Sequence, residues 1–456
     1  QVNGRVSRIA EMKVLRAHYY FELSRLFNKI PYFDENVEIS QYPDIPNNEF
    51  TRDEILSMLA KEMLDAAELL PASQSEVGRI HKYIALAYAA KIKLYQAYQQ
   101  DETTHAVTSI NKELLREVVS LCDQVTASNR YGLLDDFQGL DLVANENGKE
   151  SVFAIQYSMN DGTESAGRIN WSNLLNSPGG GSPYGGDGFF LPSQDLINAY
   201  QTDANGLPDF NYQSKSDYSW AVLNNGVYTL QNTTPNVDPR LDFVVGRPTI
   251  TWKTYPDKPC EGWVRDKETY GYNCAKRFWV SPESSDMFNG WPWGASQLNW
   301  QIIRYADILL WKAEALIELN EGDGLETARD LINQIRNRAR NSAYVKDFND
   351  HSKYAANYLV NPYPADVWNQ DYARQALRWE TRLEKALEGE RFFDLVRWGI
   401  VETTMNKYIT AESDNRIYYA NAHFTGGKDE YYPVPNNQYG FSGGKYVQNP
   451  GYAPFN

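Results

Sequence analysis

Apolar residues recur at three- and four-residue steps near both ends of the chain, a pattern typical of amphipathic helices. The apolar positions of residues 7–27 fall on one helical face, and residues 79–100 are rich in alanines that suit close helix contact. Thr51 and Glu54 form a capping-box pair in front of another such segment. The pattern predicts helices over residues 7–27, 51–70, 79–100, 111–128, 301–319 and 325–340, and two more over 370–398 that hinge at Gly389.

The middle of the chain lacks this periodicity. Residues 131–300 hold 18 of the 30 glycines and 8 of the 12 tryptophans. Asn224-Asn225-Gly226 lies between the alternating segments 220–223 and 227–230, which predicts a β-hairpin. A long glycine-rich stretch without regular elements is typical of functional loops.

These patterns predict a mainly α fold, in which a tetratricopeptide-like array of helix pairs supports a long loop-rich region with a few short β-hairpins. The strict tetratricopeptide consensus is absent, so periodicity alone establishes only helical hairpins. We divide the chain into N-terminal helical hairpins, a loop-rich aromatic insertion that forms the ligand-binding half, C-terminal helical hairpins and an irregular C-terminal segment. The corresponding residues are 1–130, 131–300, 301–400 and 401–456, within one compact domain.

The net charge of the chain limits the classes of molecule that it can bind. The chain has 59 acidic and 44 basic residues and a formal net charge of −15, which disfavours nucleic acid and acidic polysaccharides unless a local basic patch overrides the average. The longest uncharged apolar run, near residues 83–90, is far shorter than the roughly 20 residues that span a bilayer. The first residues also lack the features of a signal peptide.

The three cysteines do not match a zinc pattern. Cys122 lies in a helical segment and is expected to be a buried thiol. Cys260 and Cys274 bracket a short loop, and a disulfide between them would stabilise the fold by roughly 3 kcal/mol. Two unpaired thiols are the alternative.

The sequence contains none of the common catalytic motifs. It has no nucleotide-binding glycine loop, no G-x-S-x-G and no H-E-x-x-H, and its five histidines are scattered singly. The two carboxyl groups of a glycosidase have no fixed spacing, so the sequence nominates no pair. The acidic turn at residues 203–206 is compatible with Ca²⁺, but it completes no calcium-loop pattern. We therefore expect no catalysis and no cofactor.

Aromatic residues in the loops suit the binding of sugars. A pyranose ring has an apolar C–H face ringed by hydroxyl groups, and exposed Trp or Tyr rings offer it a flat, rigid surface. The alternative is that most of these rings fill the joint between loops and helices. The candidate glycan-binding residues are Trp291, Trp293, Trp263, Trp252, Tyr255 and Asn289.

Five segments, in order along nearly the whole chain, resemble the motifs of the SusD/RagB family of Bacteroidetes nutrient-binding lipoproteins. The first, AEMKVLRAHYYF at residues 10–21, is followed by RLF at 25–27 and IP at 30–31. The other four are IRYADILL at 303–310 with AEA at 313–315, INQIRNRA at 332–339, EGERFFDLVRWG at 388–399 and QNPGY at 448–452.

This resemblance implies a right-handed array of helix pairs, a lipid anchor in the outer membrane, and a position over a TonB-dependent, SusC-like transporter. Family ligands are mostly oligosaccharides or polysaccharides, with peptides in some members. Members usually begin with a signal peptide, a lipidated Cys and a further helical stretch, so we expect that part, with the anchoring Cys, to be missing from this sequence. Five charged motif residues are expected to form structural ion pairs: Arg304, Asp307, Arg336, Arg391 and Asp394.

The first functional hypothesis is therefore non-catalytic capture of a glycan at the cell surface and its delivery to the transporter. A glycoside hydrolase is the second hypothesis. A helical-repeat adaptor that binds a peptide or the transporter is the third, and the long aromatic loops argue against it.

Overall fold

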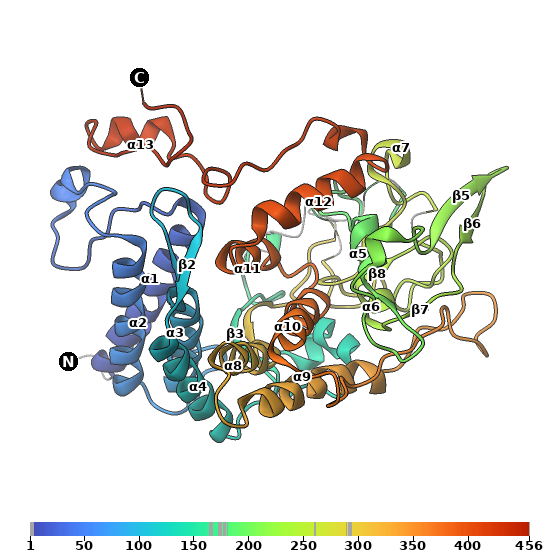
Figure 1. Cartoon of the computed structure of the whole chain (residues 1–456), viewed down its shortest axis with the longest axis horizontal. Coiled ribbons are helices and arrows are strands. Elements are labelled where there is room, and N and C mark those ends of the chain that lie inside the picture. The colour runs from blue at the N-terminus through green and yellow to red at the C-terminus, as the bar shows by residue number, and fades with distance from the viewer. Residues whose placement is uncertain are drawn as a thin grey trace.

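The structure, a computed structural model, describes residues 4–163, 167–171, 176, 179, 181–259, 261–288, 290 and 294–455. Paired helices form one part of the molecule, and loops with short strands and helices form the other (Figure 1). The helices are α1 (Arg5–Phe27), α2 (Arg52–Leu69), α3 (Lys82–Ala97), α4 (Lys112–Ala127), α5 (Gln194–Ala199), α6 (Arg240–Val244), α7 (Lys267–Tyr270), α8 (Tyr305–Leu319), α9 (Gly324–Asn341), α10 (Gln370–Glu384), α11 (Arg391–Arg397), α12 (Val401–Ser413) and α13 (Asn436–Phe441).

The strands of the described residues pair antiparallel in twos: β1 with β2, β3 with β10, β4 with β7, β5 with β6, and β8 with β9. Their bounds are β1 (Tyr98–Gln100), β2 (Val107–Ile110), β3 (Ser151–Ile155), β4 (Gln201–Thr202), β5 (Trp220–Asn224), β6 (Val227–Gln231), β7 (Asn236–Val237), β8 (Val245–Gly246), β9 (Cys274–Ala275) and β10 (Trp300–Arg304).

The predicted helices are present, with two corrected ends. Thr51 accepts a hydrogen bond from the N–H of Glu54, and the Glu54 carboxylate accepts one from the N–H of Thr51, so the capping box of α2 is confirmed. Residues 98–100, predicted as helix, form β1, and residues 301–304 belong to β10. Both segments pair with another strand, β1 with the nearby β2 and β10 with the distant β3, and this pairing outweighs the helical pattern at those positions.

The C-terminal segment is not irregular throughout, as the sequence led us to expect. Residues 401–413 form α12, which contacts α11 and α5, and α13 follows later. The buried residues of α12 are Val401 and Glu412, so this helix has no apolar stripe from which it could be predicted. The predicted hairpin is β5–β6, and Asn225 and Gly226 have φ angles of 52° and 79°, as a type I′ turn requires.

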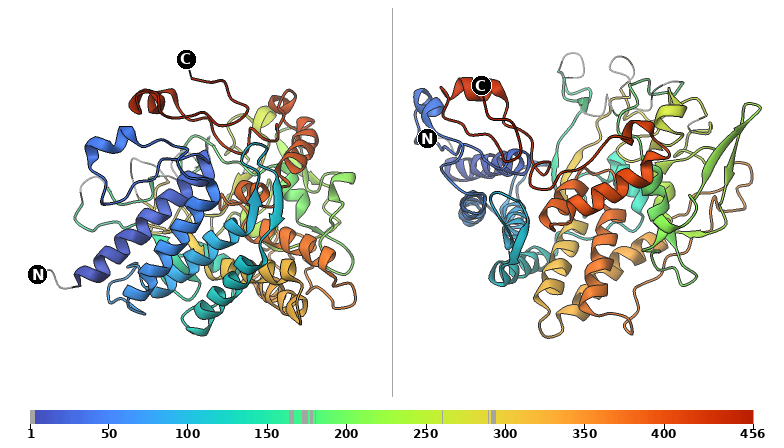
Figure 2. Two further views of the ribbon diagram at one scale, coloured as in Figure 1. Left: turned by 60° about the vertical axis from the view of Figure 1, so that its left-hand side comes forward. Right: turned by 45° about the horizontal axis from the view of Figure 1, so that its top comes forward.

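Consecutive helices pack on one another from α1 to α4, α4 packs on α8, and α8 packs on α9 (Figure 2). The core between them is rich in alanine, leucine and isoleucine side chains and buries Cys122, as predicted. Aromatic residues are more frequent in the separate cores of the loop-rich half. None of the helices in the described residues is long and apolar enough to span a membrane.

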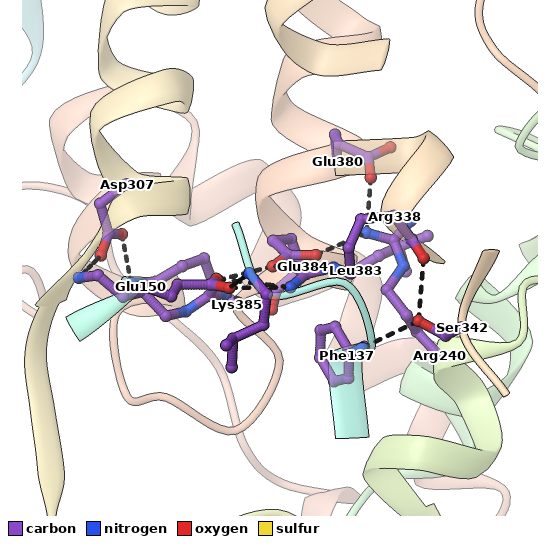
Figure 3. Close-up of polar contacts among 12 residues, drawn as sticks. Phe137, Glu150, Arg240, Asp307, Arg338, Ser342, Glu380, Leu383, Glu384 and Lys385 are labelled. Carbon is purple, nitrogen blue, oxygen red and sulfur yellow. Dashed lines mark hydrogen bonds and ion pairs between the residues drawn. The ribbon is translucent and has the colours of Figure 1, made fainter. Parts of the chain in front are cut away.

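A buried ion-pair network joins the helical array to the loop-rich half (Figure 3). Glu384, at the end of α10, pairs with Arg304 of β10 at 2.6 Å, with Arg240 of α6 at 3.1 Å and with Arg338 of α9. Arg304 also pairs with Glu150 at 3.0 Å. Because these side chains come from five segments far apart in sequence, the network fixes the position of the loops on the helices.

Buried ion pairs, in this network and on α11, account for most of the charged motif residues. Arg304, Asp307, Arg336 and Asp394 form ion pairs as predicted, with Glu384, Lys385, Glu380 and Arg397 respectively. Arg391 is an exception: within the described part of the chain it forms no ion pair, and its guanidinium lies 5.9 Å from the ring of Trp398. Trp398 lies seven residues further along the chain, about two helical turns, so it is on the same side of α11 as Arg391.

Candidate functional site

Exposed aromatic rings from three separate segments surround a cavity of about 240 Å³ in the loop-rich half. We call it the aromatic pocket. It is lined by Gly188, Phe189, Phe190, Leu191, Pro192, Ser193, Tyr270, Tyr408, Glu412, Arg416, Tyr418 and Tyr419. The side chains of Phe189, Phe190, Tyr270 and Tyr418 are 60%, 45%, 49% and 51% exposed. Large rings that remain this accessible beside a cavity mark a binding surface.

The tyrosines of the pocket support one another. Tyr418 lies with its ring centroid 6.1 Å from that of Tyr270 and 4.6 Å from that of Tyr419. The hydroxyl oxygens of Tyr419 and Tyr408 are 3.1 Å apart. Contacts of this kind hold the rings in defined orientations, so little side-chain freedom is lost when a ligand stacks on them.

Local backbone geometry places the rings. Phe190 has a φ angle of 60°, a left-handed conformation that is strained for a bulky side chain. Ser193 then caps α5 by accepting a hydrogen bond from the N–H of Leu196. On the opposite wall, α12 carries Tyr408, and the short 3₁₀ turn Ile417–Tyr419 carries Tyr418.

Gly271 makes room for a guanidinium group beside the pocket. Its φ is +80°, and a Cβ atom there would lie 1.9 Å from Nη2 of Arg416. The backbone angle therefore favours glycine, and any larger residue would displace the end of the Arg416 side chain. Arg416 is buried, and its Nη1 donates a 2.7 Å hydrogen bond to the carbonyl oxygen of Asn415.

Glu412 is the carboxyl group of the pocket. It is 1% exposed, and its Oε1 accepts a hydrogen bond from the N–H of Asp195, while its Oε2 has no partner within the described structure. Burial raises the pKa of Glu412 to about 7, although the N–H of Asp195 and the charge of Arg416 oppose that rise.

Two of the predicted glycan-binding tryptophans are buried. Trp252 is 0% and Trp263 is 4% exposed, and their ring centroids lie 5.5 Å apart in a cluster with Tyr184 and Trp279. Here the rings fill the interior of the loop region, and neither presents a face to solvent. Tyr255 is half-buried and packs on Trp263 at 5.5 Å.

Four other predicted residues, Trp291, Trp293, Asn289 and Cys260, lie outside the described residues. Their role in binding, and the bridge between Cys260 and Cys274, stay predictions. The rings that form the pocket were missed because sequence reasoning followed tryptophan. The available signals were the adjacent aromatics Phe189-Phe190 and Tyr418-Tyr419 in segments without apolar periodicity.

Two further cavities, of about 530 and 560 Å³, are lined by a mixture of charged, amide and apolar residues with few aromatic rings. The described residues contain no group of three or more His, Cys, Asp or Glu that could hold a metal ion. In the acidic turn, the Asp203 carboxylate accepts hydrogen bonds from the N–H groups of Asn205 and Leu207.

Comparisons with known proteins agree on one family. A SusD-like protein of Bacteroides ovatus is 22% identical over 423 residues, which cover 87% of this chain and 61% of that protein. The chain thus spans less than two thirds of this relative's length.

Solved structures agree as well. A SusD-like carbohydrate binding protein of Bacteroides fragilis has a TM-score of 0.68 at 20% identity, covering 97% of this chain and 80% of that one. Surface glycan-binding protein A of Bacteroides thetaiotaomicron, in complex with laminarihexaose, has a TM-score of 0.64 at 17% identity, covering 98% and 80%. The SusD family model matches residues 149–452, so the chain belongs to the SusD family.

Proposed function

We propose that this chain captures an oligosaccharide or polysaccharide without cleaving it, at the outer surface of the outer membrane, and delivers it to a TonB-dependent, SusC-like transporter. The observation that carries the proposal is the aromatic pocket, whose exposed Phe and Tyr rings can stack on the C–H faces of sugar rings. Family membership and the laminarihexaose complex of a structural relative support it. Trp291 and Trp293 stay proposed as further sugar contacts.

The lining of the pocket favours binding over hydrolysis. Glycosidases use two carboxyl groups that face each other across the scissile bond. Among the described residues that line the aromatic pocket, Glu412 is the one with a carboxyl group. A raised pKa suits a general acid, but a hydrolase would need its partner carboxylate as well.

A screen of plant, host and microbial glycans by array or affinity gel, with tryptophan fluorescence on each hit, tests the function. We expect at least one neutral glycan to bind and to remain uncut. Release of reducing ends would identify a hydrolase instead. If no glycan binds, the proposed function is wrong, and a peptide ligand becomes the better hypothesis.

Single substitutions then test whether the glycan binds at the aromatic pocket. Phe189→Ala and Tyr418→Ala should each weaken binding about tenfold, because each removes one stacking surface worth about 1.4 kcal/mol. Phe441→Ala is the matched control, since Phe441 is 55% exposed but lies on α13, outside the pocket. Unchanged binding in both pocket variants, with loss in Trp291→Ala or Trp293→Ala, would move the site to the loop that carries those tryptophans.

A further inference from the structure

Two polar groups in the aromatic pocket have unused capacity for hydrogen bonds. Oε2 of Glu412 is buried without a partner. Arg416 carries five N–H donors, and no carboxylate in the described part of the chain forms a salt bridge with it, Glu412 included. A buried acceptor without a donor is destabilising until something supplies one.

The side chains next to Glu412 form their hydrogen bonds and ion pairs with other residues, and none of them donates a hydrogen bond to Oε2 within the described structure. Asp195 of α5 offers its backbone N–H to Oε1, but its carboxylate pairs with Arg382 at 2.6 Å. The Asp217 carboxylate accepts hydrogen bonds from the amides of Asn198 and Asn415. The hydroxyl of Tyr408 lies next to that of Tyr419. The carboxylates of Asp195 and Asp217 thus have other partners, and the remaining charged or titratable neighbours of Glu412 are Arg416 and Tyr418.

We infer that Glu412 and Arg416 form the polar floor of the aromatic pocket and bind neighbouring hydroxyl groups of one neutral sugar unit, with Glu412 accepting and Arg416 donating. This inference rests on the proposed function and names the chemical class of its ligand. Adjacent sugar hydroxyls can supply one donor and one acceptor at the same time. An acidic sugar would instead bring a second carboxylate beside Glu412, and like charges at short range repel.

Capture should then depend on pH. Because a hydroxyl that donates to Oε2 stabilises the ionised carboxylate, the ligand binds the deprotonated form of Glu412 and binding releases a proton. The pKa of Glu412 is raised to about 7 by burial. The Glu412 carboxyl would be ionised in only about a tenth of the molecules at about pH 6 and in about nine tenths at about pH 8. The affinity for the ligand should therefore rise about tenfold between these pH values.

Isothermal titration tests this with whichever of laminarihexaose, cellohexaose, maltohexaose and mannohexaose binds the wild-type protein. Titrations at about pH 6, 7 and 8, each in two buffers of different ionisation enthalpy, give both affinity and proton release. We expect about tenfold tighter binding at pH 8 and release of close to one proton per ligand at pH 6. Hexagalacturonate, the acidic counterpart, should bind more weakly than the neutral probe.

The variant Glu412→Gln keeps the shape of the side chain and should bind more weakly with no pH slope. Glu146→Gln is the matched control, because burial also raises the pKa of Glu146 to about 7 and this residue does not line the pocket. The control should keep the slope of the wild type. Circular dichroism checks the folding of both variants, and the proton release of the wild type needs no variant.

Several outcomes would overturn the inference. The first is a wild-type affinity that is the same from pH 6 to 8. The second is a change of affinity with pH that remains in Glu412→Gln or disappears in Glu146→Gln. The third is tighter binding of hexagalacturonate than of the neutral probe. If binding needs Phe189 and Tyr418 but shows no slope, only the role of Glu412 is wrong. If none of the neutral probes binds and the wider screen is silent, the proposed function is wrong as well.

Discussion

At the scale of single residues, two buried glutamates of this chain have pKa values shifted in opposite directions. Burial by itself raises the pKa of both. In Glu384 the charges of Arg338, Arg304 and Arg240 outweigh burial and lower the pKa to about 2, whereas Glu412 has one weaker cationic neighbour and its pKa is about 7. The difference lies entirely in the neighbours that folding supplies.

The raised pKa of Glu412 predicts how stability changes with pH. The ordinary value for Glu is 4.5, so between about pH 4.5 and 7 the folded state holds a proton that the unfolded state has lost. The free energy of unfolding of the wild type should therefore fall as pH rises through this window. Glu412→Gln removes the titration and should be more stable than the wild type at about pH 8, by on the order of 2–3 kcal/mol.

Urea unfolding at about pH 5 and pH 8, followed by circular dichroism, measures this difference. It should be large at pH 8 and shrink toward acid pH. The same difference at both pH values would mean that Glu412 has an ordinary pKa. This measurement needs no ligand and so stands apart from the binding experiments.

At the scale of elements, the helices and the hairpin that were predicted best are those specified by a few neighbouring residues. The capping box of α2 involves Thr51 and Glu54, and the β5–β6 turn is specified by Asn225-Gly226. Strand β1 was missed because it continues directly from α3 and pairs with the short β2 a few residues on, and β10 was missed because its partner β3 is about 150 residues away. Pairing over such a distance leaves little trace in local periodicity.

The ends of α8, α9 and α10 depend on the ion-pair network, which gives a prediction for Glu384. In Glu384→Gln, Arg304, Arg338 and Arg240 would share one carboxylate fewer in a buried site. The loss of stability at neutral pH should be on the order of 3–5 kcal/mol, because buried charges would be left uncompensated. Glu326→Gln on the exposed face of α9 should change stability by less than about 0.5 kcal/mol.

Acid unfolding separates this effect from a simple packing defect. With its pKa lowered to about 2, Glu384 contributes stability above pH 4.5 that is lost as pH falls toward 2. The gap between wild type and Glu384→Gln should close over that range. A gap that stays constant down to about pH 2 would show that charge pairing is not the cause.

At the scale of the whole molecule, the C-terminal segment crosses from the loop-rich half back to the first helix (Figures 1 and 2). Asn449, in the QNPGY motif, is 2% exposed, and its Nδ2 donates to the carbonyl oxygens of Phe27 at 2.7 Å and of Tyr432 at 2.8 Å. The side chain of Gln448 forms two hydrogen bonds with the backbone of Val434. The motif therefore fastens the end of the chain to α1.

Asn449→Ala should loosen this attachment. The carbonyl oxygens of Phe27 and Tyr432 would each lose the hydrogen bond from Asn449, at a cost of about 0.5–1.5 kcal/mol per bond. Limited trypsin digestion, followed by mass spectrometry, should then cleave faster after the exposed Lys445. Asn437→Ala, at an exposed position of α13, is the control, and equal cleavage rates in both variants would contradict the role of Asn449.

The sequence by itself determined the helical array, the hairpin, the buried Cys122 and the family. Apolar stripes, caps and Asn-Gly turns act over a few residues, and the motif residues keep their order along the chain. It also predicted that aromatic loops bind the ligand, which stays a proposal. Its interpretation of the charged motif residues as structural was confirmed for four of the five: Asp394 pairs within α11 at i,i+3 spacing, and the other three pair with residues distant in sequence.

Only the tertiary structure decided which rings face solvent. Trp252 and Trp263 are buried while Phe189 and Tyr418, more than two hundred positions apart, meet at one cavity. Exposure depends on what the rest of the chain packs against a ring, and the pKa of Glu412 depends on the same surroundings. These quantities are set by contacts between distant segments, so no local pattern of residues could specify them.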